Sequence, residues 1–198
     1  MRRRYFLSLP LLASCGKKVV AVPEVFRAKF ITSKGDFVVE ATRAWSPRGV
    51  GRFHELLGRG YFDEGRFFRV VPGFIAQFGV HRDFETHRIW RELFIADDPR
   101  TQSNTRGTLA FAQSEQHTRA TEIFINLADN AALDEQGFVP FARVVEGMDV
   151  VDRLYAGYGE MRPAGKYIDP GRVEEGANAY LTPRFPLMDY IRRTEILK

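Results

Sequence analysis

The stretch FFRVVPGFIAQFG, residues 67–79, decides how this chain is interpreted. It holds two short apolar runs on either side of Pro72-Gly73, a pair that fits the centre of a type II turn. Two polar residues interrupt these runs, namely Arg69, which is charged at every relevant pH, and Gln77. Val or Ile would pack there at lower cost, because a buried polar group must find a hydrogen-bond partner.

The turn leaves open whether Arg69 and Gln77 face each other. A strict two-residue hairpin pairs Arg69 with Ala76 and sends Gln77 to the opposite face of the sheet. A wider or bulged connection brings Arg69 and Gln77 together. Alternation alone favours a third interpretation, in which both are exposed residues of half-buried strands.

The segments around this stretch predict many short strands. Residues 25–42 form two runs on either side of the turn-forming residues 33–36, which predicts a hairpin with Phe26, Ala28, Phe30 and Thr32 on one face. Further strands are predicted at residues 66–71, 74–79, 108–112, 122–127, 138–145 and 189–197.

Two helices are predicted between the strands. The first has Ser46 as its N-cap and Pro47 at its first position, and it ends at Gly58 or Gly60. The second lies within residues 146–159, and the inward residues of the two helices are Val50, Phe53, Leu56, Leu57, Met148, Val151 and Leu154. Short strands with two separated helices predict a mainly β protein, a closed or nearly closed antiparallel barrel with helices covering its ends.

Composition describes one globular domain. The 198 residues are 44% hydrophobic and 27% charged, which excludes a disordered or membrane-spanning chain. The 17 Phe residues indicate a Phe-lined core or pocket, and the net charge of +4 suggests a nucleic-acid ligand.

Most of that net positive charge comes from the N-terminal segment. MRRRYFLSLPLLASCGKK has a basic start, a short apolar run and small residues before Cys15, the only cysteine, which is typical of a secretory signal. Its apolar run is too short for a membrane-spanning helix. Without residues 1–14, 26 basic residues stand against 25 acidic ones, so nucleic-acid binding loses its main support.

The sequence LASC, residues 12–15, resembles the lipobox of bacterial lipoproteins, in which the cut precedes a lipidated cysteine. We therefore expect a signal peptide at residues 1–14, a lipid anchor at Cys15 with a tether over 15–24, and a domain over 25–198. The expected location is outside the cytoplasm, with the protein held by lipid at a membrane and facing the periplasm or cell exterior. An ordinary signal with a chance cysteine is the alternative, and a twin-arginine route stays open beside the general one.

Most catalytic patterns are absent from the sequence, including the Walker, Rossmann, G-x-S-x-G and H-E-x-x-H motifs. HRDFETH would place His81, Asp83, Glu85 and His87 on one face of an extended segment, a ligand set suited to zinc. A polar surface loop is the favoured interpretation of this segment. No metal and no cofactor are predicted.

Residues 67–79 resemble the F-H-R-x-x-P-G-F-x-x-Q-G-G signature of cyclophilin-type peptidyl-prolyl isomerases. GTLAFA (107–112) and EIFINLADNAALDEQGFVPFARVVEGMDVVDRL (122–154) continue the match in order. The resemblance covers residues 25–155 well and the tail more loosely. It implies an eight-stranded antiparallel closed barrel capped by two helices, which isomerises X-Pro bonds in peptides and unfolded exported proteins. A monomer that binds no nucleic acid is the default expectation.

The resemblance also implies roles for particular residues. Arg69 corresponds to the catalytic arginine, Phe74 to the floor of the proline pocket, and Gln77 to a glutamine that bonds the substrate backbone. The other substrate-binding positions it implies are Ile75, Ala112, Gln113, Glu122, Phe124, Leu133 and Phe138.

Three departures from the family pattern stand out. Glu122 replaces a second groove glutamine, AQSEQHT (112–118) replaces a tight Gly-Pro loop, and Ala132 replaces a tryptophan that contacts cyclosporin. Ala132 argues for weak cyclosporin binding. Glu122 either pairs with Arg69, which lowers activity or favours basic peptides, or points to solvent. A low-activity peptide-binding or chaperone module on the same barrel is therefore the alternative function.

Overall fold

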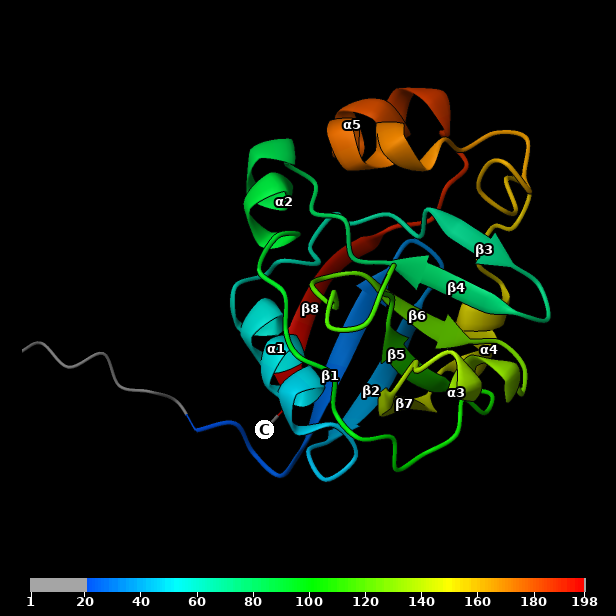
Figure 1. The fold of residues 1–198 in the computed structure, drawn as a ribbon. Coiled ribbons are helices and arrows are strands. Elements are labelled where there is room, and N and C mark those ends of the chain that lie inside the picture. Colours follow the sequence, from blue (N-terminus) through cyan, green and yellow to red (C-terminus); the bar gives the residue numbers. More distant parts are fainter. Residues whose placement is uncertain (1–20, 198) are drawn as a thin grey trace, which may run out of the picture.

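The structure is a computed structural model that describes residues 21–197, so the predicted signal peptide and Cys15 lie outside the described residues (Figure 1). Its eight strands are β1 (Val25–Thr32), β2 (Asp36–Thr42), β3 (Arg69–Val71), β4 (Ile75–Phe78), β5 (Thr108–Phe111), β6 (Ile123–Asn126), β7 (Pro140–Glu146) and β8 (Ile191–Leu197). Its helices are α1 (Pro47–Gly58), α2 (Phe84–Trp90), α3 (Ala132–Glu135), α4 (Met148–Asp152) and α5 (Pro170–Arg184).

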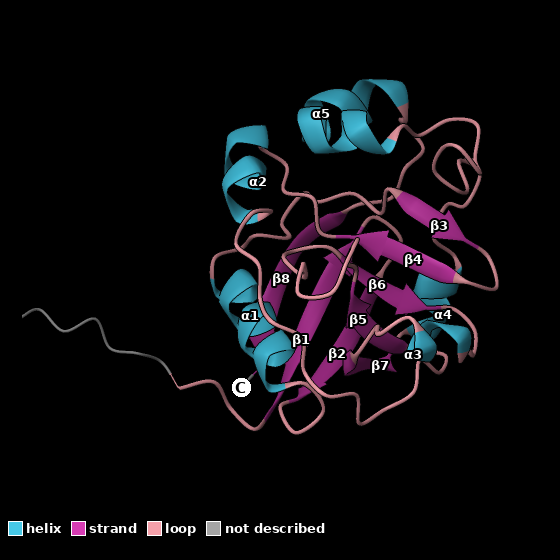
Figure 2. Cartoon of the chain, viewed as in Figure 1, coloured by secondary structure: helices cyan, strands magenta, loops and turns pink. Residues whose placement is uncertain are grey.

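The strands form one antiparallel sheet in the order β3-β4-β6-β5-β7-β2-β1-β8, which confirms the mainly β, eight-stranded architecture. The sheet curls into a half-barrel, and the expectation of full closure needs correction. Its end strands β3 and β8 share no ladder; the segment before β3 meets the segment before β8 through one bridge, between Arg66 and Tyr190. In Figure 2, α1 and α4 lie on opposite sides of the sheet.

The first hairpin shows why the sequence folds locally as it does. Phe26, Ala28, Phe30 and Thr32 alternate along β1 and are all buried, as predicted. Phe30 stacks on Phe37 of β2 with ring centroids 4.9 Å apart, which joins the two strands within an aromatic core. Alternating apolar residues thus fix which face of the hairpin is buried.

Helix α1 begins after Ser46 and buries its predicted stripe, but its cap comes from elsewhere in the chain. The Ser46 hydroxyl donates to the carboxylate of Asp98, which lies in a distant loop. That carboxylate also accepts the backbone N–H groups of Arg48 and Gly49 at 3.0–3.2 Å. A carboxylate at a helix N-terminus interacts favourably with the unpaired N–H groups and with the dipole.

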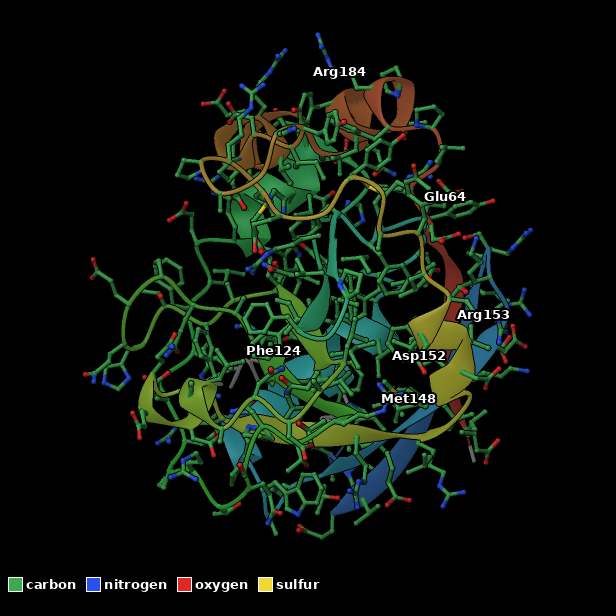
Figure 3. The ribbon with its side chains drawn as sticks, turned by 90° about the vertical axis from the view of Figure 1, so that its right-hand side faces the viewer. Glu64, Phe124, Met148, Asp152, Arg153 and Arg184 are labelled. Atoms are coloured by element: carbon green, nitrogen blue, oxygen red, sulfur yellow. The ribbon has the colours of Figure 1, made fainter. Side chains whose placement is uncertain are left out.

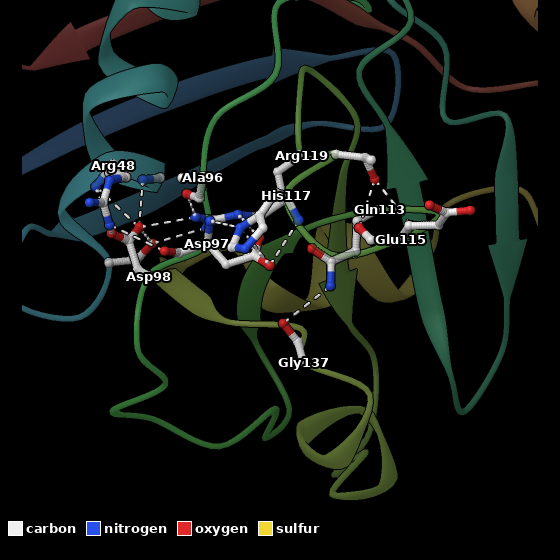
Figure 4. A network of polar contacts seen from close by, with 12 residues as sticks. Arg48, Ala96, Asp97, Asp98, Gln113, Glu115, His117, Arg119 and Gly137 are labelled. Carbon is white, nitrogen blue, oxygen red and sulfur yellow. Dashed lines mark hydrogen bonds and ion pairs between the residues drawn. The ribbon is translucent and has the colours of Figure 1, made fainter.

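A fully buried arginine completes this network (Figure 4). The guanidinium of Arg119 pairs with Asp97 at 3.0 Å and with Asp98 at 3.3 Å, and it donates to the backbone carbonyl of Ala96. Burial opposes ionisation of Asp98, but hydrogen bonds from Ser46, Gly49 and Arg48 together lower its pKa. The network ties α1 to the loop that precedes β6.

Three helices in the described chain, α2, the single-turn α3 and α5, were not predicted. Asp83 caps α2 by accepting the N–H of Thr86, and Asp169 caps α5 by accepting the N–H of Arg172. Both caps are visible in the sequence as Asp before a helix start, and Pro170 adds a favourable first position. Helix α5 bends at Ala177, and its glycines weaken the helical signal. The second predicted helix is real but ends at Asp152.

The C-terminal segment builds a second apolar cluster on top of the sheet, where α2 and α5 lie together (Figure 1). Ile168, Val173 and Leu181 pack there with Phe68, the residue immediately before Arg69. The residues between α4 and α5 reach the same cluster through Tyr158 and Met161. This segment is therefore held against the strand that carries the predicted catalytic arginine.

Within residues 21–197, no helix combines the length and the apolar character needed to cross a membrane.

We expect Asp98→Ala to lower the free energy of unfolding by about 3 kcal/mol, since it leaves the buried Arg119 and the first N–H groups of α1 short of partners. Urea-induced unfolding measures this loss. Asp36→Ala is the control, because it breaks an exposed pair with Lys29 and removes no buried group. Equal effects of the two substitutions would contradict the role assigned to Asp98.

Candidate functional site

The β3–β4 hairpin brings Arg69 and Gln77 together. Its ladder pairs Arg69 with Gln77, Val70 with Ala76 and Val71 with Ile75. The connection thus has three residues, 72–74, and Gly73 takes a φ of 71°, which favours glycine. Nη1 of Arg69 donates to Oε1 of Gln77 at 3.0 Å. Of the arrangements left open by the sequence, the wider connection is correct.

The predicted proline-pocket residues form one apolar cluster, separate from the main core. Ile75, Phe124 and Leu133 are its buried members, and Phe74, Phe138 and Ala112 are partly exposed against them. The rings of Phe124, labelled in Figure 3, and Phe138 meet edge to face with centroids 5.4 Å apart. The sequence therefore named a set of side chains that the fold does bring together.

The guanidinium of Arg69 lies at the rim of this apolar cluster. Its central carbon is 5.6 Å from the centre of the Phe74 ring. The side chain is 21% exposed, so a bound peptide can reach it. A fixed cation beside a partly exposed apolar cluster is the main chemical feature of the site.

A carboxylate that the sequence interpretation missed pairs with this arginine. Nε and Nη2 of Arg69 each lie 2.6 Å from an oxygen of Glu160, from the segment between α4 and α5. The Nη2 contact is a hydrogen bond, whereas the Nε contact is an ion pair without hydrogen-bond geometry. No motif marks Glu160 in the sequence, because 91 residues separate it from Arg69.

Glu122 neither pairs directly with Arg69 nor points to solvent, so both predictions for it were wrong. It accepts a hydrogen bond from Nε2 of Gln77 at 2.6 Å and also hydrogen-bonds the carboxyl group of Glu174 on α5. Gly79 makes this placement possible, because a Cβ there would lie 2.3 Å from the carbonyl oxygen of Thr121. The backbone before β6 can thus approach the end of β4 closely.

The two carboxyl groups have opposite protonation tendencies. Burial and the neighbouring Glu174 raise the pKa of Glu122 well above its usual value. Burial also opposes ionisation of Glu174, but hydrogen bonds from His87 and Glu122 and the charge of Arg91 lower its pKa. Of the two carboxyl groups, Glu174 thus ionises first, and a proton shared by the pair lies preferentially on Glu122.

The loop that departs from the family pattern, residues 112–118, is held in place by its neighbours (Figure 4). His117 adopts a φ of 65°, its N–H donates to Asp97, and its Nδ1 accepts the N–H of Asp97 at 3.0 Å. Oε1 of Gln113 is buried without a hydrogen-bond partner in the described chain. That oxygen is closed to solvent and is therefore not exposed to a bound peptide.

A pocket of about 430 Å³ continues the site beyond Gln77. Its predicted lining residues are Gln77, Ala112, Gln113 and Glu122, and other walls come from the segment that follows α2 and from the C-terminal segment. Sequence reasoning missed these other walls, since no motif marks the two segments that form them. Their contribution includes Arg91, Phe94, Met161, Val173 and Glu174.

The HRDFETH segment is no extended metal-binding face. Asp83 caps α2, and His87 is buried between the Tyr61 hydroxyl and the carboxylate of Glu174, each at 3.2 Å. The preferred surface loop was also wrong, because most of this segment is helix. Among residues 21–197, no group of three or more His, Cys, Asp or Glu side chains is arranged to hold a metal ion.

Comparison with known proteins agrees with this geometry. Residues 27–173 match the family model described as cyclophilin type peptidyl-prolyl cis-trans isomerase/CLD. Peptidyl-prolyl cis-trans isomerase B of Escherichia coli is 32% identical over 133 residues, which cover 63% of this chain and 81% of that protein. Peptidyl-prolyl cis-trans isomerase-like 1 of Aspergillus oryzae is 33% identical over 154 residues, which cover 74% of this chain and 95% of that protein.

Solved structures support the fold. A cyclophilin type peptidyl-prolyl cis-trans isomerase from Cryptosporidium parvum superimposes with a TM-score of 0.63 at 18% identity, covering 88% of this chain and 98% of its own. The family match extends over most of the chain and includes both strands of the hairpin that carries Arg69 and Gln77. The chain belongs to the cyclophilin-type peptidyl-prolyl cis-trans isomerases and is an enzyme of that class.

Proposed function

We propose that this isomerase assists the folding of exported proteins, and that Arg69 stabilises the twisted X-Pro amide during rotation. The observation that carries the mechanism is the guanidinium of Arg69 beside the Phe74 ring, at the rim of a partly exposed apolar cluster. Export rests on the signal-like residues 1–14 and the lipobox-like Cys15.

Catalysis of this reaction requires little more than selective binding of the twisted amide. Rotation about the amide costs roughly 18–20 kcal/mol, because it breaks the double-bond character of the C–N bond. A catalyst must bind the twisted state more tightly than either planar state. Neither a nucleophile nor a proton donor is required for that.

Arg69 supplies the interaction that only the twisted state makes. When conjugation is lost, the proline nitrogen becomes pyramidal and can accept a hydrogen bond. Nη1 and Nη2 of Arg69 each use one N–H toward Gln77 or Glu160 and keep a second. The guanidinium stays charged throughout, so the donor is permanent.

The apolar cluster holds the ring while the acyl side turns. Phe74, Phe124 and Phe138 offer aromatic surfaces for the ring. Backbone groups near Ala112, which packs against the same cluster, hydrogen-bond the peptide and keep it in register. Hydrogen bonds of this kind exchange readily with water, which suits turnover.

Glu122 in its protonated form replaces the family's glutamine in function. A carboxylic acid and a primary amide are planar groups of similar size, and each both donates and accepts. The protonated Glu122 accepts from Gln77 and donates to the Glu174 carboxylate. Gln77 therefore keeps the orientation in which its oxygen accepts from Arg69.

Arg69→Ala is expected to lower the rate of cis–trans exchange on the order of 10²-fold, as removal of one preorganised donor does elsewhere. Exchange in an Ala-Pro peptide is followed by NMR. Arg153→Ala is the matched control, since Arg153 is an exposed residue of the α4 end that pairs with Asp149 (Figure 3). Peptide binding without acceleration by the unaltered protein would favour the low-activity binding module.

Glu122→Gln tests the protonated acid through stability. For a carboxyl group with a raised folded-state pKa, stability is fully present below the unfolded value of 4.5 and is lost as pH rises toward the folded value. The unaltered protein should therefore lose about 1.4 kcal/mol per pH unit relative to Glu122→Gln in that window. Urea unfolding at a series of pH values measures the difference. Parallel pH profiles would show that Glu122 is ionised in the folded protein.

A further inference from the structure

The catalytic arginine needs help to stay in one position. An arginine side chain loses rotamer entropy when it is fixed, and this loss must be offset before its N–H groups point in one direction. Within the sheet, Arg69 donates one side-chain hydrogen bond, to Oε1 of Gln77 at 3.0 Å. A single contact at one terminal nitrogen leaves the planar guanidinium free to swing about that contact.

Glu160 provides the second point of attachment. Its two oxygens lie 2.6 Å from Nε and Nη2, the edge of the guanidinium that faces away from Gln77. The carboxylate is itself oriented, because Oε1 accepts the backbone N–H of Met161 at 2.7 Å. The carboxylate makes one hydrogen bond, at Nη2, and one ion pair, at Nε, so it holds the guanidinium at both nitrogens of this edge.

The segment that carries Glu160 is anchored on both sides. Before it, the N–H of Tyr155 donates to Asp189 at 2.7 Å, and Tyr158 packs edge to face on Phe185. After it, Ile168 is fully buried in the apolar cluster that also contains Phe68, the chain neighbour of Arg69. The position of Glu160 relative to β3 is thus set by packing that does not involve the ion pair.

We propose that Glu160 is a positioning residue for this isomerase, which holds the Arg69 guanidinium at its outer edge so that its remaining N–H groups face the proline pocket. The inference rests on the proposed role of Arg69. It deepens that role by assigning part of the catalytic apparatus to the C-terminal segment rather than to the sheet.

The test separates binding from rotation. NMR line shapes recorded over a range of Ala-Pro peptide concentrations give the dissociation constant and the exchange rate on the enzyme separately. Glu160→Ala should lower the on-enzyme rate about tenfold, as small misplacements of catalytic groups do, with the dissociation constant within about twofold. Glu160→Gln keeps the shape of the side chain and one acceptor oxygen, so its on-enzyme rate should lie between those of Glu160→Ala and the unaltered protein. If the alanine variant fails to fold, the comparison of Glu160→Gln with the unaltered protein is the test.

Two further readouts show whether Glu160 acts through the arginine. In an Arg69→Lys background, where no two-point pairing exists, Glu160→Ala should cause no additional loss. The Nε–H signal of Arg69, identified by its absence in Arg69→Lys, should broaden in Glu160→Ala. Asp152→Asn is the control, since it breaks another 2.6 Å arginine–carboxylate pair, with Arg106, on α4.

The outcomes are distinct. A faster rate in Glu160→Ala would overturn the proposal, because it would make Glu160 an internal competitor of the substrate. An equal loss in the Arg69→Lys background would also overturn it and would assign Glu160 a structural role. If Arg69→Ala retains full activity, the proposed role of Arg69 fails, whatever Glu160 does.

Discussion

The register of the β3–β4 hairpin is the constraint on which the site depends. Side chains alternate between the two faces of a strand, so a shift of one residue would send Gln77 to the face opposite Arg69. The three-residue connection, with Gly73 at positive φ, sets the pairing of Arg69 with Gln77. From that pairing follow the hydrogen bond at Nη1, the place of the guanidinium beside Phe74, and the direction of the Gln77 amide.

A continuous series of polar side chains crosses the site, and each one is paired or hydrogen-bonded with the next. Glu160 pairs with Arg69, Arg69 donates to Gln77, Gln77 donates to Glu122, and Glu122 bonds Glu174. Buried polar groups are costly when unpaired, so a fully connected chain of this kind holds its members in one arrangement. The raised pKa of Glu122 favours its neutral form, which is compatible with a position beside the carboxylate of Glu174.

Both ends of that chain lie in the C-terminal segment. Glu160 stands between α4 and α5, and Glu174 is on α5, where His87 and Arg91 of α2 pair with it. The segment packs through its own apolar cluster onto Phe68 instead of entering the main aromatic core. The sheet thus carries Arg69 and Gln77, and a separate layer contacts this polar chain from outside the sheet.

Much of the fold follows from local patterns in the sequence. Alternation in β1 and β2, the apolar stripe of α1, and the ordered family motifs determined the antiparallel sheet and the apolar pocket side chains, because neighbours in sequence share a face. The Asp83 and Asp169 caps can also be recognised in the sequence. Their helices were not predicted, because glycines and polar residues weaken the helical pattern.

The sequence by itself determined which side chains are available for the chemistry, Arg69, Gln77 and the phenylalanines of the pocket. Only the tertiary structure decided how they are held. The hairpin register, the pairing of Glu160 with Arg69, and the protonation of Glu122 depend on residues brought together from distant parts of the chain. Burial and charge at such contacts are properties of the folded surroundings, which no local pattern of residues encodes.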